Sequence, residues 1–138
     1  MQFKKISSGF LLRLIKGESV LEKLTEFCEK EKVFGACITG IGALKKAEIG
    51  HYSMEKKKYE TKLFEEELEV LSFAGNISLK EGKPFVHVHV VLGRKDFSVL
   101  GGHFVSGIVG PTLELFVKQV QPVIERKQAE NGLFLLDL

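Results

Sequence analysis

The chain has 138 residues, and its 20 Lys and Arg residues nearly balance its 18 Asp and Glu residues, for a net charge of +2. This length suits a single compact domain, and a hydrophobic fraction of 44% excludes a disordered chain. The charge balance does not indicate a basic face of the kind that binds nucleic-acid phosphates.

The short apolar runs and the small number of cysteines indicate the cellular compartment in which we expect the protein. No run is long enough for a transmembrane helix, and Arg13 interrupts the only apolar stretch near the N-terminus, which excludes a secretory signal. Two cysteines cannot form a disulfide framework, so we expect Cys28 and Cys37 to be small buried apolar residues. These features predict one reduced, cytoplasmic domain over residues 1–138, with no membrane partner.

A strand followed by a helix is predicted first. Residues 9–15 form the apolar run Gly-Phe-Leu-Leu-Arg-Leu-Ile, which is typical of a strand. Ser19 and Glu22 have the spacing of a capping box, and apolar residues then recur at helical spacing. Gly35 supplies a stop signal just past this pattern, so we expect the helix over 19–32.

The rest of the chain predicts mainly strands. Gly40 to Gly42 indicates a tight turn, and Met54 to Lys58 a charged hairpin tip. For 112–120 a period of two favours a strand, although a helix stays open. The expected strands are 36–39, 47–52, 59–64, 68–74, 76–79, 85–92, 97–104, 112–120 and 132–138. We therefore predict an α+β fold with a mainly antiparallel, barrel-like sheet, one clear N-terminal helix and room for one or two more short helices.

Three of the four histidines lie within 17 positions, and two of them share a strand. In the run from Phe85 to Val91, alternation places His87 and His89 on one face and the valines on the other. Their Cα atoms are then about 6.6 Å apart, from a rise of about 3.3 Å per residue. Two rings that lean together across this gap can share one metal ion.

The length of the next hairpin loop decides whether His103 joins them. With a three-residue loop, Arg94 to Asp96, residue numbers of paired positions sum to 190, and His103 lies opposite His87 on the same face. A four-residue loop turns His103 to the other face. Gly101 and Gly102 also permit a bulge that would change the direction of the ring.

Two interpretations of the three histidines stay open at this point. They are either ordinary sheet residues, solvated or hydrogen-bonded, or ligands of one metal ion. The His-x-His pattern with a third histidine behind Gly-Gly favours the metal. Three neutral imidazoles with an open fourth position are typical of catalytic zinc, so we expect a divalent ion, zinc, at His87, His89 and His103.

Four segments in this order resemble the PPC ("plants and prokaryotes conserved") domain family. They are Gly40-x-Gly42-Ala43-Leu44, Leu68 to Ile77, Phe85 to Val90, and Leu100-Gly101-Gly102-His103. The resemblance extends over nearly the whole chain, and its most specific part is the His-x-His motif with the Gly-Gly-His motif. The chain is therefore similar to a prokaryotic single-domain member.

The resemblance implies an α+β fold that assembles as a homotrimer and holds a metal through His87, His89 and His103. The fold is also similar to that of acetolactate decarboxylase, a zinc protein with three histidine ligands. Similarity of fold alone does not indicate that this chain has the same substrate. Plant members contain an Arg-Gly-Arg-Pro hook for the DNA minor groove. This chain lacks that tetrapeptide; Gly93-Arg94-Lys95 is only a basic turn.

Two further sets of residues allow either a functional role or an ordinary structural one. Glu114 lies within an apolar strand, so it is either a catalytic acid or base beside the metal or an edge residue that reaches solvent. Lys56, Lys57 and Lys58 stand near Tyr52 and Tyr59 and suggest a nucleic-acid loop. A charged hairpin tip is the favoured interpretation, because Glu55 and Glu60 flank the lysines.

Two classes of function follow. In the first, the metal serves as a Lewis acid in a lyase or hydrolase that acts on a small carbonyl or ester substrate, with Glu114 as catalytic residue. In the second, the chain is a non-enzymatic, DNA-associated or protein-interaction regulatory module without an AT-hook. Metal content and the salt dependence of DNA binding discriminate between them.

Overall fold

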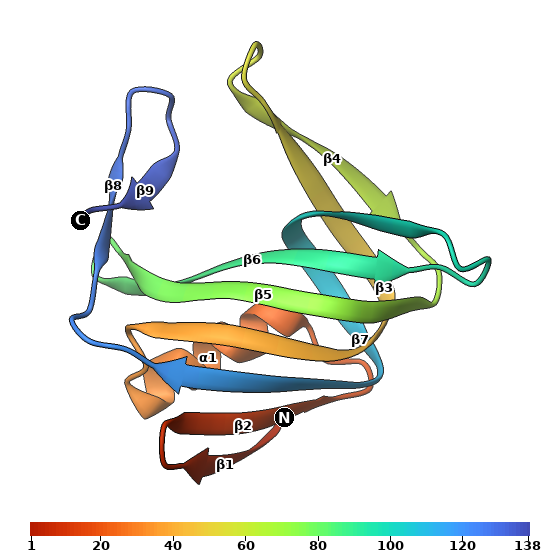
Figure 1. Cartoon of the computed structure of the whole chain (residues 1–138), viewed down its shortest axis with the longest axis horizontal. Helices are drawn as coiled ribbons and strands as arrows, with labels where there is room; N and C mark the ends of the chain where they lie inside the picture. The colour runs from red at the N-terminus through yellow and green to blue at the C-terminus, as the bar shows by residue number, and fades with distance from the viewer.

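The computed structural model describes residues 1–138 and contains one helix and a nine-stranded sheet (Figure 1). All strand pairs are antiparallel except one, so the predicted α+β class with a mainly antiparallel sheet is confirmed. The elements are β1 Gln2–Ile6, β2 Gly9–Ile15, α1 Val20–Glu31, β3 Ala36–Ser53, β4 Lys58–Phe64, β5 Leu68–Lys80, β6 Lys83–Gly93, β7 Val99–Gln119, β8 Glu125–Gln128 and β9 Phe134–Leu136.

Four strands close into a ring. β7 pairs with β3 and with β6, while β5 also pairs with both β3 and β6. The circuit β3–β5–β6–β7 therefore has no free edge inside it, which gives the sheet its barrel-like shape. Two hairpins, β3–β4 and β8–β9, rise from the same side of this ring (Figure 1).

The helix α1 matches its predicted range and buries the predicted face. Val20, Leu24, Phe27 and Cys28 are all buried, at helical spacing. In Figure 1 the helix lies behind the strands, against one face of the sheet. Burial of this apolar stripe in the shared core, rather than helix propensity alone, is what stabilises a helix of 12 residues.

Both helix ends differ from the prediction. Ser19 is the N-cap, but its side chain makes no capping hydrogen bond, so the capping box with Glu22 does not form. Instead, the carboxylate of Glu18 accepts a hydrogen bond from the backbone N–H of Ile15 and pairs with the N-terminal amine. The C-cap is Lys32, in the left-handed conformation with φ 57°, and not Gly35.

The strands are longer than the sequence indicates. The expected runs 36–39 and 47–52 are one strand, β3, and 68–74 and 76–79 are likewise one strand, β5. The predicted tight turn at Gly40 to Gly42 was wrong. Gly42 lies at φ 155°, beside a shift in register, and a Cβ there would meet the carbonyl oxygen of Thr112 at 2.4 Å. A close approach of two strands, not a turn, requires this glycine.

The structure also differs from the prediction in three of the strands and in the burial of one cysteine. The run 112–120 continues 97–104 within the single strand β7, while β1 and β8 had no counterpart in the predicted elements. Cys28 is buried as expected, but Cys37 is exposed, so that expectation was wrong for Cys37. None of the helical segments has the length and apolar character needed to cross a membrane.

Candidate metal centre and adjoining pocket

The two faces of β6 have different roles. Val88 and Val90 point into the hydrophobic core and are buried, whereas His87 and His89 point to the other face. This is the alternation that the sequence predicts for a strand. The ring centroids of His87 and His89 lie 5.3 Å apart, so the two imidazoles face the same space.

His103 joins this pair from β7. Its ring centroid lies 5.2 Å from that of His87 and 5.4 Å from that of His89. One candidate ligand atom from each ring can be chosen so that all of them lie within 4.8 Å of one another. The structure therefore brings the three predicted histidines into one cluster.

The register of the hairpin differs from both of the registers considered from the sequence. Gly93 pairs with Val99, which leaves residues 94–98 as the loop, and His103 lies opposite His89 instead of His87. The loop is longer than either of the two lengths considered from the sequence, but the shift of two positions from the three-residue register leaves His103 on the histidine face. Inside the loop, Asp96 accepts hydrogen bonds from the N–H and hydroxyl of Ser98.

Gly101 and Gly102 let β7 pass close to its neighbours just before His103. A Cβ at Gly101 would lie 2.7 Å from the carbonyl oxygen of Val90, and one at Gly102 would lie 2.8 Å from that of Gly50. Pairing with β6 runs through both glycines without a shift, so no bulge forms against that strand. The glycines thus place His103 by permitting close strand contact.

The protonation state of the cluster suits metal coordination. Burial, with smaller effects from the charge of Arg126 and from the neighbouring rings, lowers the pKa of His87 to about 4. Burial also lowers the pKa of His103, with His89 adding to the effect. The rings of His87 and His103 are therefore neutral at pH 7, and neutral imidazole is the form that binds a metal.

The donor set fits a single divalent ion. Zn–N bonds of about 2.0–2.1 Å require tetrahedral ligand atoms roughly 3.4 Å apart, and the candidate ligand atoms here lie within 4.8 Å of one another. Nδ1 of His103 is buried and has no hydrogen-bond partner within the protein. Such an orphaned nitrogen is costly unless a ligand satisfies it, and the cluster as a whole lacks any cysteine that would close the site.

Arg126, from β8, is buried beside His87. Its Nε donates a hydrogen bond to Oγ of Ser78 at 2.8 Å, and its Nη1 donates to the carbonyl oxygen of Phe134 at 2.8 Å. Its Nη2 donates to Oδ1 of Asn76 at 2.7 Å and lies 3.3 Å from Nδ1 of His87. Burial lowers the pKa of Arg126 from its usual value, and no carboxylate pairs with the guanidinium.

A cavity of about 370 Å³ adjoins the histidine cluster, and His87 and His103 form part of its wall. The two hairpins that rise in Figure 1 supply most of the remaining wall: Tyr52 to Tyr59 on one side and Arg126 to Leu135 on the other. The hydroxyl of Tyr52 donates to the carbonyl oxygen of Asn131 at 2.9 Å and so connects the hairpins. Tyr59 packs against His103, with ring centroids 4.6 Å apart.

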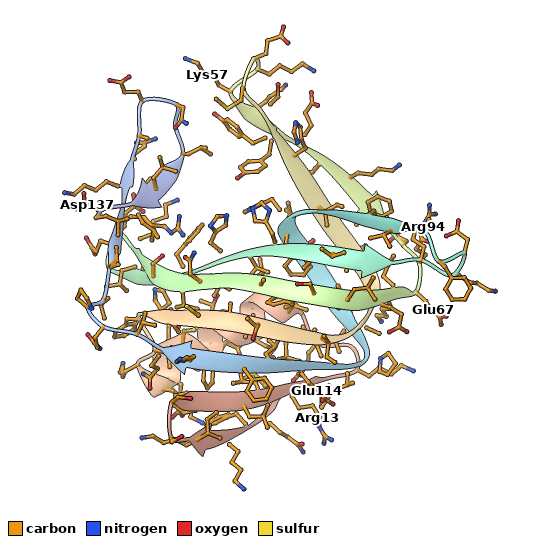
Figure 2. The ribbon with its side chains drawn as sticks, viewed as in Figure 1. Arg13, Lys57, Glu67, Arg94, Glu114 and Asp137 are labelled. Carbon is orange, nitrogen blue, oxygen red and sulfur yellow. The ribbon has the colours of Figure 1, made fainter.

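Glu114 does not belong to this site. It is exposed, pairs with Arg13 in register, and lies eleven residues beyond His103, or roughly 35 Å of extended chain. Figure 2 shows Glu114 beside Arg13 at the far end of the sheet from Lys57. The expected catalytic role at the metal is therefore corrected on geometric grounds. Glu114 is not an edge residue either, because β7 pairs with β2 and with β3 at this position, and its carboxylate reaches solvent from a face of the sheet.

The three lysines form a charged hairpin tip, which is the interpretation that the sequence favoured over a nucleic-acid loop. Lys56, Lys57 and Lys58 lie at the turn between β3 and β4, and Lys56 pairs with Glu60. Tyr52 and Tyr59 pack edge to face, with ring centroids 5.3 Å apart, so they are engaged with each other and with the cavity wall. They do not form a free stacking platform.

Arg126 is the residue at the site that sequence reasoning missed. It lies in a segment rich in polar residues, where an arginine is normally solvated, and contacts with β5, β6 and β9 bury it. That pairing is parallel and joins residues more than 40 positions apart, such as Leu79 and Glu125. A local pattern contains no signal for such a contact.

Fold and site together define a class: an α+β protein with a ring of antiparallel strands and a three-histidine cluster at its open side. The family model of the Plants and Prokaryotes Conserved (PCC) domain matches residues 1–121, so the chain belongs to this family, as the resemblance indicated. No curated protein matches the chain.

Several solved structures are similar over almost the whole chain. A metal-containing protein from Archaeoglobus fulgidus is 40% identical, with 99% of this chain and 97% of that one covered and a TM-score of 0.87. A plant- and prokaryote-conserved (PPC) protein from Pyrococcus horikoshii is 39% identical, with 99% and 95% covered and a TM-score of 0.89. A proposed DNA-binding protein from Bacteroides thetaiotaomicron is 28% identical, with 99% and 96% covered and a TM-score of 0.94.

Proposed function

We propose that the chain is a metal-binding protein that holds one divalent ion through His87, His89 and His103. The observation that carries this proposal is the convergence of three rings from two strands, with candidate ligand atoms all within 4.8 Å. Zinc is the ion of choice, because an all-nitrogen set of three ligands with an open fourth position suits it. The similar structure from Archaeoglobus fulgidus is described as a metal-containing protein, which supports the proposal.

We further propose that the site acts on a small molecule. When bound, such an ion supplies Lewis-acid chemistry, since it polarises a carbonyl oxygen or acidifies a water molecule. The adjoining cavity of about 370 Å³ is in the usual size range for small-molecule sites. In it, Tyr59 and Phe85 would orient the body of a carbonyl or ester substrate, which makes a lyase or hydrolase the proposed class.

A homotrimer is the proposed assembly, with residues 1–138 forming a single domain in each subunit. Exposed apolar residues lie close together on the outer face: Ile41 with Leu71, and Leu71 with Phe97 and Val99. A contiguous patch of this kind is typical of an interaction surface. Sedimentation that gives a monomer would contradict the trimer, and Leu71→Lys should dissociate it.

Metal analysis tests the site directly. The full chain, purified and incubated with zinc before desalting, should contain about one ion per chain. The double variant His87→Ala/His89→Ala should contain almost none, because a single remaining imidazole binds too weakly. His51→Ala is the matched control, since His51 is exposed on β3 and lies outside the cluster. Equal metal content in the double variant and the control would refute the proposed site.

DNA association is the second candidate, and the name of the Bacteroides thetaiotaomicron structure favours it. The hairpin tip at Lys56 to Lys58 is the basic segment available for such contacts, although Glu60 already pairs with Lys56. A titration of DNA binding against salt should show a steep slope if several phosphates are neutralised. A steep slope together with no bound metal would favour this candidate over the metal site.

A further inference from the structure

We propose that the cavity beside the histidine cluster binds a small organic anion, and that the guanidinium of Arg126 is the group that binds its carboxylate or phosphate. The inference deepens the proposed function, because it names the chemical class of ligand that would meet the metal. It stands on residues other than the three histidines, so the two ideas can fail separately.

The first observation is a buried cation without an anion. Arg126 is buried, with 7% of the residue exposed, and its hydrogen-bond acceptors, Ser78, Phe134 and Asn76, are all neutral. A buried charge is costly unless an opposite charge compensates it. Because Arg126 lines the cavity, an anion held in the cavity would supply the missing charge.

The donors of Arg126 leave room for that anion. A guanidinium has five N–H donors. One at Nε and one at Nη1 are used by protein oxygens, and both at Nη2 face Asn76 and His87. One N–H of Nη1 therefore has no protein acceptor, and it is available for a charge-assisted hydrogen bond to an oxyanion.

The second observation is the charge of the cavity wall. Lys57, Lys58, Lys80 and Arg126 line it, and no Asp or Glu does. The chain as a whole has 18 acidic residues, and the surface lysines Lys23, Lys46, Lys56 and Lys127 each pair with one. The lysines of the wall make no such pair. Walls of one sign concentrate ligands of the opposite sign.

The third observation is the aromatic lining, which favours an organic anion over an inorganic one. Tyr59, Phe85 and Phe134 contribute rings to the wall. Nζ of Lys80 lies 3.7 Å from the centroid of the Phe134 ring, and the guanidinium carbon of Arg126 lies 5.1 Å from that of Phe85. Flat apolar surface next to cationic groups suits a ligand with an anionic end and an apolar body.

The anion subsite is built mainly from the C-terminal segment. Arg126 and residues 131–135 lie beyond residues 1–121, the part that the family model matches. This segment is nevertheless held firmly, by pairing of β8 with β5 and by the hydrogen bond from Tyr52 to Asn131. The ligand specificity we infer therefore depends on residues that the family match does not include.

Calorimetric titration of the zinc-loaded full chain with benzoate, benzamide and phenyl phosphate tests the inference. Benzamide is the neutral isostere of benzoate, so it should bind at least tenfold more weakly. The variant Arg126→Met should reduce benzoate affinity at least tenfold, while the control Arg94→Met should not, because Arg94 lies in the β6–β7 loop and pairs with Glu66. Whichever of benzoate and phenyl phosphate binds more tightly identifies the anionic group.

Equal affinity of the wild-type chain for benzoate and benzamide would overturn the inference, as would unchanged benzoate affinity in Arg126→Met. If Arg126→Met does not fold, Arg126→Lys takes its place. It keeps the charge but loses the planar fork, so it should preserve discrimination against benzamide with weaker benzoate binding.

A metal-free control separates this inference from the proposed function. In His89→Ala, which removes an exposed member of the cluster, benzoate should still bind more tightly than benzamide. A chain that binds zinc but does not distinguish the two probes would refute the anion site alone. A chain that distinguishes them but never binds zinc would refute the metal site alone.

Discussion

The two faces of β6 show how one strand serves two purposes. On one face Val88, Val90 and Leu92 are almost completely buried and contact the common core. On the other, His87 is partly accessible and lines a cavity, and His89 is exposed. The backbone and its hydrogen bonds to β5 are common to both faces, so only the side chains distinguish them.

The difference lies in how well each face satisfies its own groups. The core face of β6 carries only apolar side chains, whereas the histidine face lies beside an orphaned nitrogen on His103 of β7 and an uncompensated charge on Arg126 of β8. A face selected only for stability would not keep such groups. The comparison predicts that mutations on the two faces will affect different properties.

Leu92→Ala should have the largest effect on stability. Leu92 is fully buried, so the substitution removes apolar contacts and leaves a cavity, which costs about 2–5 kcal/mol of unfolding free energy. Urea denaturation of the metal-free chain measures the change. A loss below about 1 kcal/mol would mean that the core face is less tightly packed than described.

Gly75→Ala should damage both faces together. A Cβ at Gly75 would lie 1.9 Å from the carbonyl oxygen of His87 and 2.8 Å from Cα of Val88, so β6 has to move. We expect a loss of about 1–3 kcal/mol in unfolding free energy and weaker zinc binding. Gly93→Ala is the control, because its Cβ would meet only the flexible side chain of Leu71 at 3.4 Å. Similar losses from both substitutions would contradict the strand contact described for Gly75.

The pH dependence of stability should report on the histidine face. The pKa of His87 falls from 6.5 to about 4 on folding, so between these values the unfolded chain binds more protons than the folded chain. Above pH 6.5 the His87 ring is neutral in both states and its titration does not affect the free energy of unfolding. As the pH falls from 6.5 towards 4, protons bind preferentially to the unfolded chain, and the folded chain loses stability.

Metal-free His87→Gln should show a shallower loss of stability over this pH window than the wild type, as measured by thermal or urea unfolding. His51→Gln, at an exposed position on β3, serves as the control and should follow the wild type. Identical slopes for His87→Gln and the wild type would show that His87 titrates normally in the folded chain.

His89→Ala should have the smallest effect on folding. Its side chain is exposed and contributes little to the core, so we expect the unfolding free energy of the metal-free chain to change by less than about 0.5 kcal/mol. Zinc should nevertheless stop stabilising the variant, whereas it stabilises the wild type in proportion to its saturation. Zinc-dependent stabilisation of both proteins to the same degree would remove His89 from the site.

The histidine cluster was predictable because residues an even number of positions apart on a strand share one face of the sheet. Alternation placed His87 and His89 on one face, and His103 stays on that face because the pairing differs by an even number of positions from the three-residue register. The loop itself was not predictable. Phe97 adopts φ 64°, a conformation that a bulky residue rarely takes, and contacts within the five-residue loop stabilise it.

Non-local contacts explain most of what the sequence did not show. Gly40 and Gly42 carry turn signals, yet they are needed where β3 lies against β7, at Glu114 and Thr112. Arg126 is polar and local patterning places it at the surface, yet pairing of β8 with β5 buries it. In each case the deciding neighbour is distant in sequence, and periodicity carries no information about it.

The long pairing of β3 with β7 has a consequence for biosynthesis. Ala36 pairs with Gln119 and Gly50 with His103, so the partner of β3 leaves the ribosome more than 50 residues later. Until then the nascent chain exposes unpaired strand edges, which are prone to aggregate. Closure of such distant contacts is slow, on the order of milliseconds to seconds. We therefore expect chaperones to engage this protein during translation, and ribosome-bound chains that stop before residue 99 to be sensitive to protease.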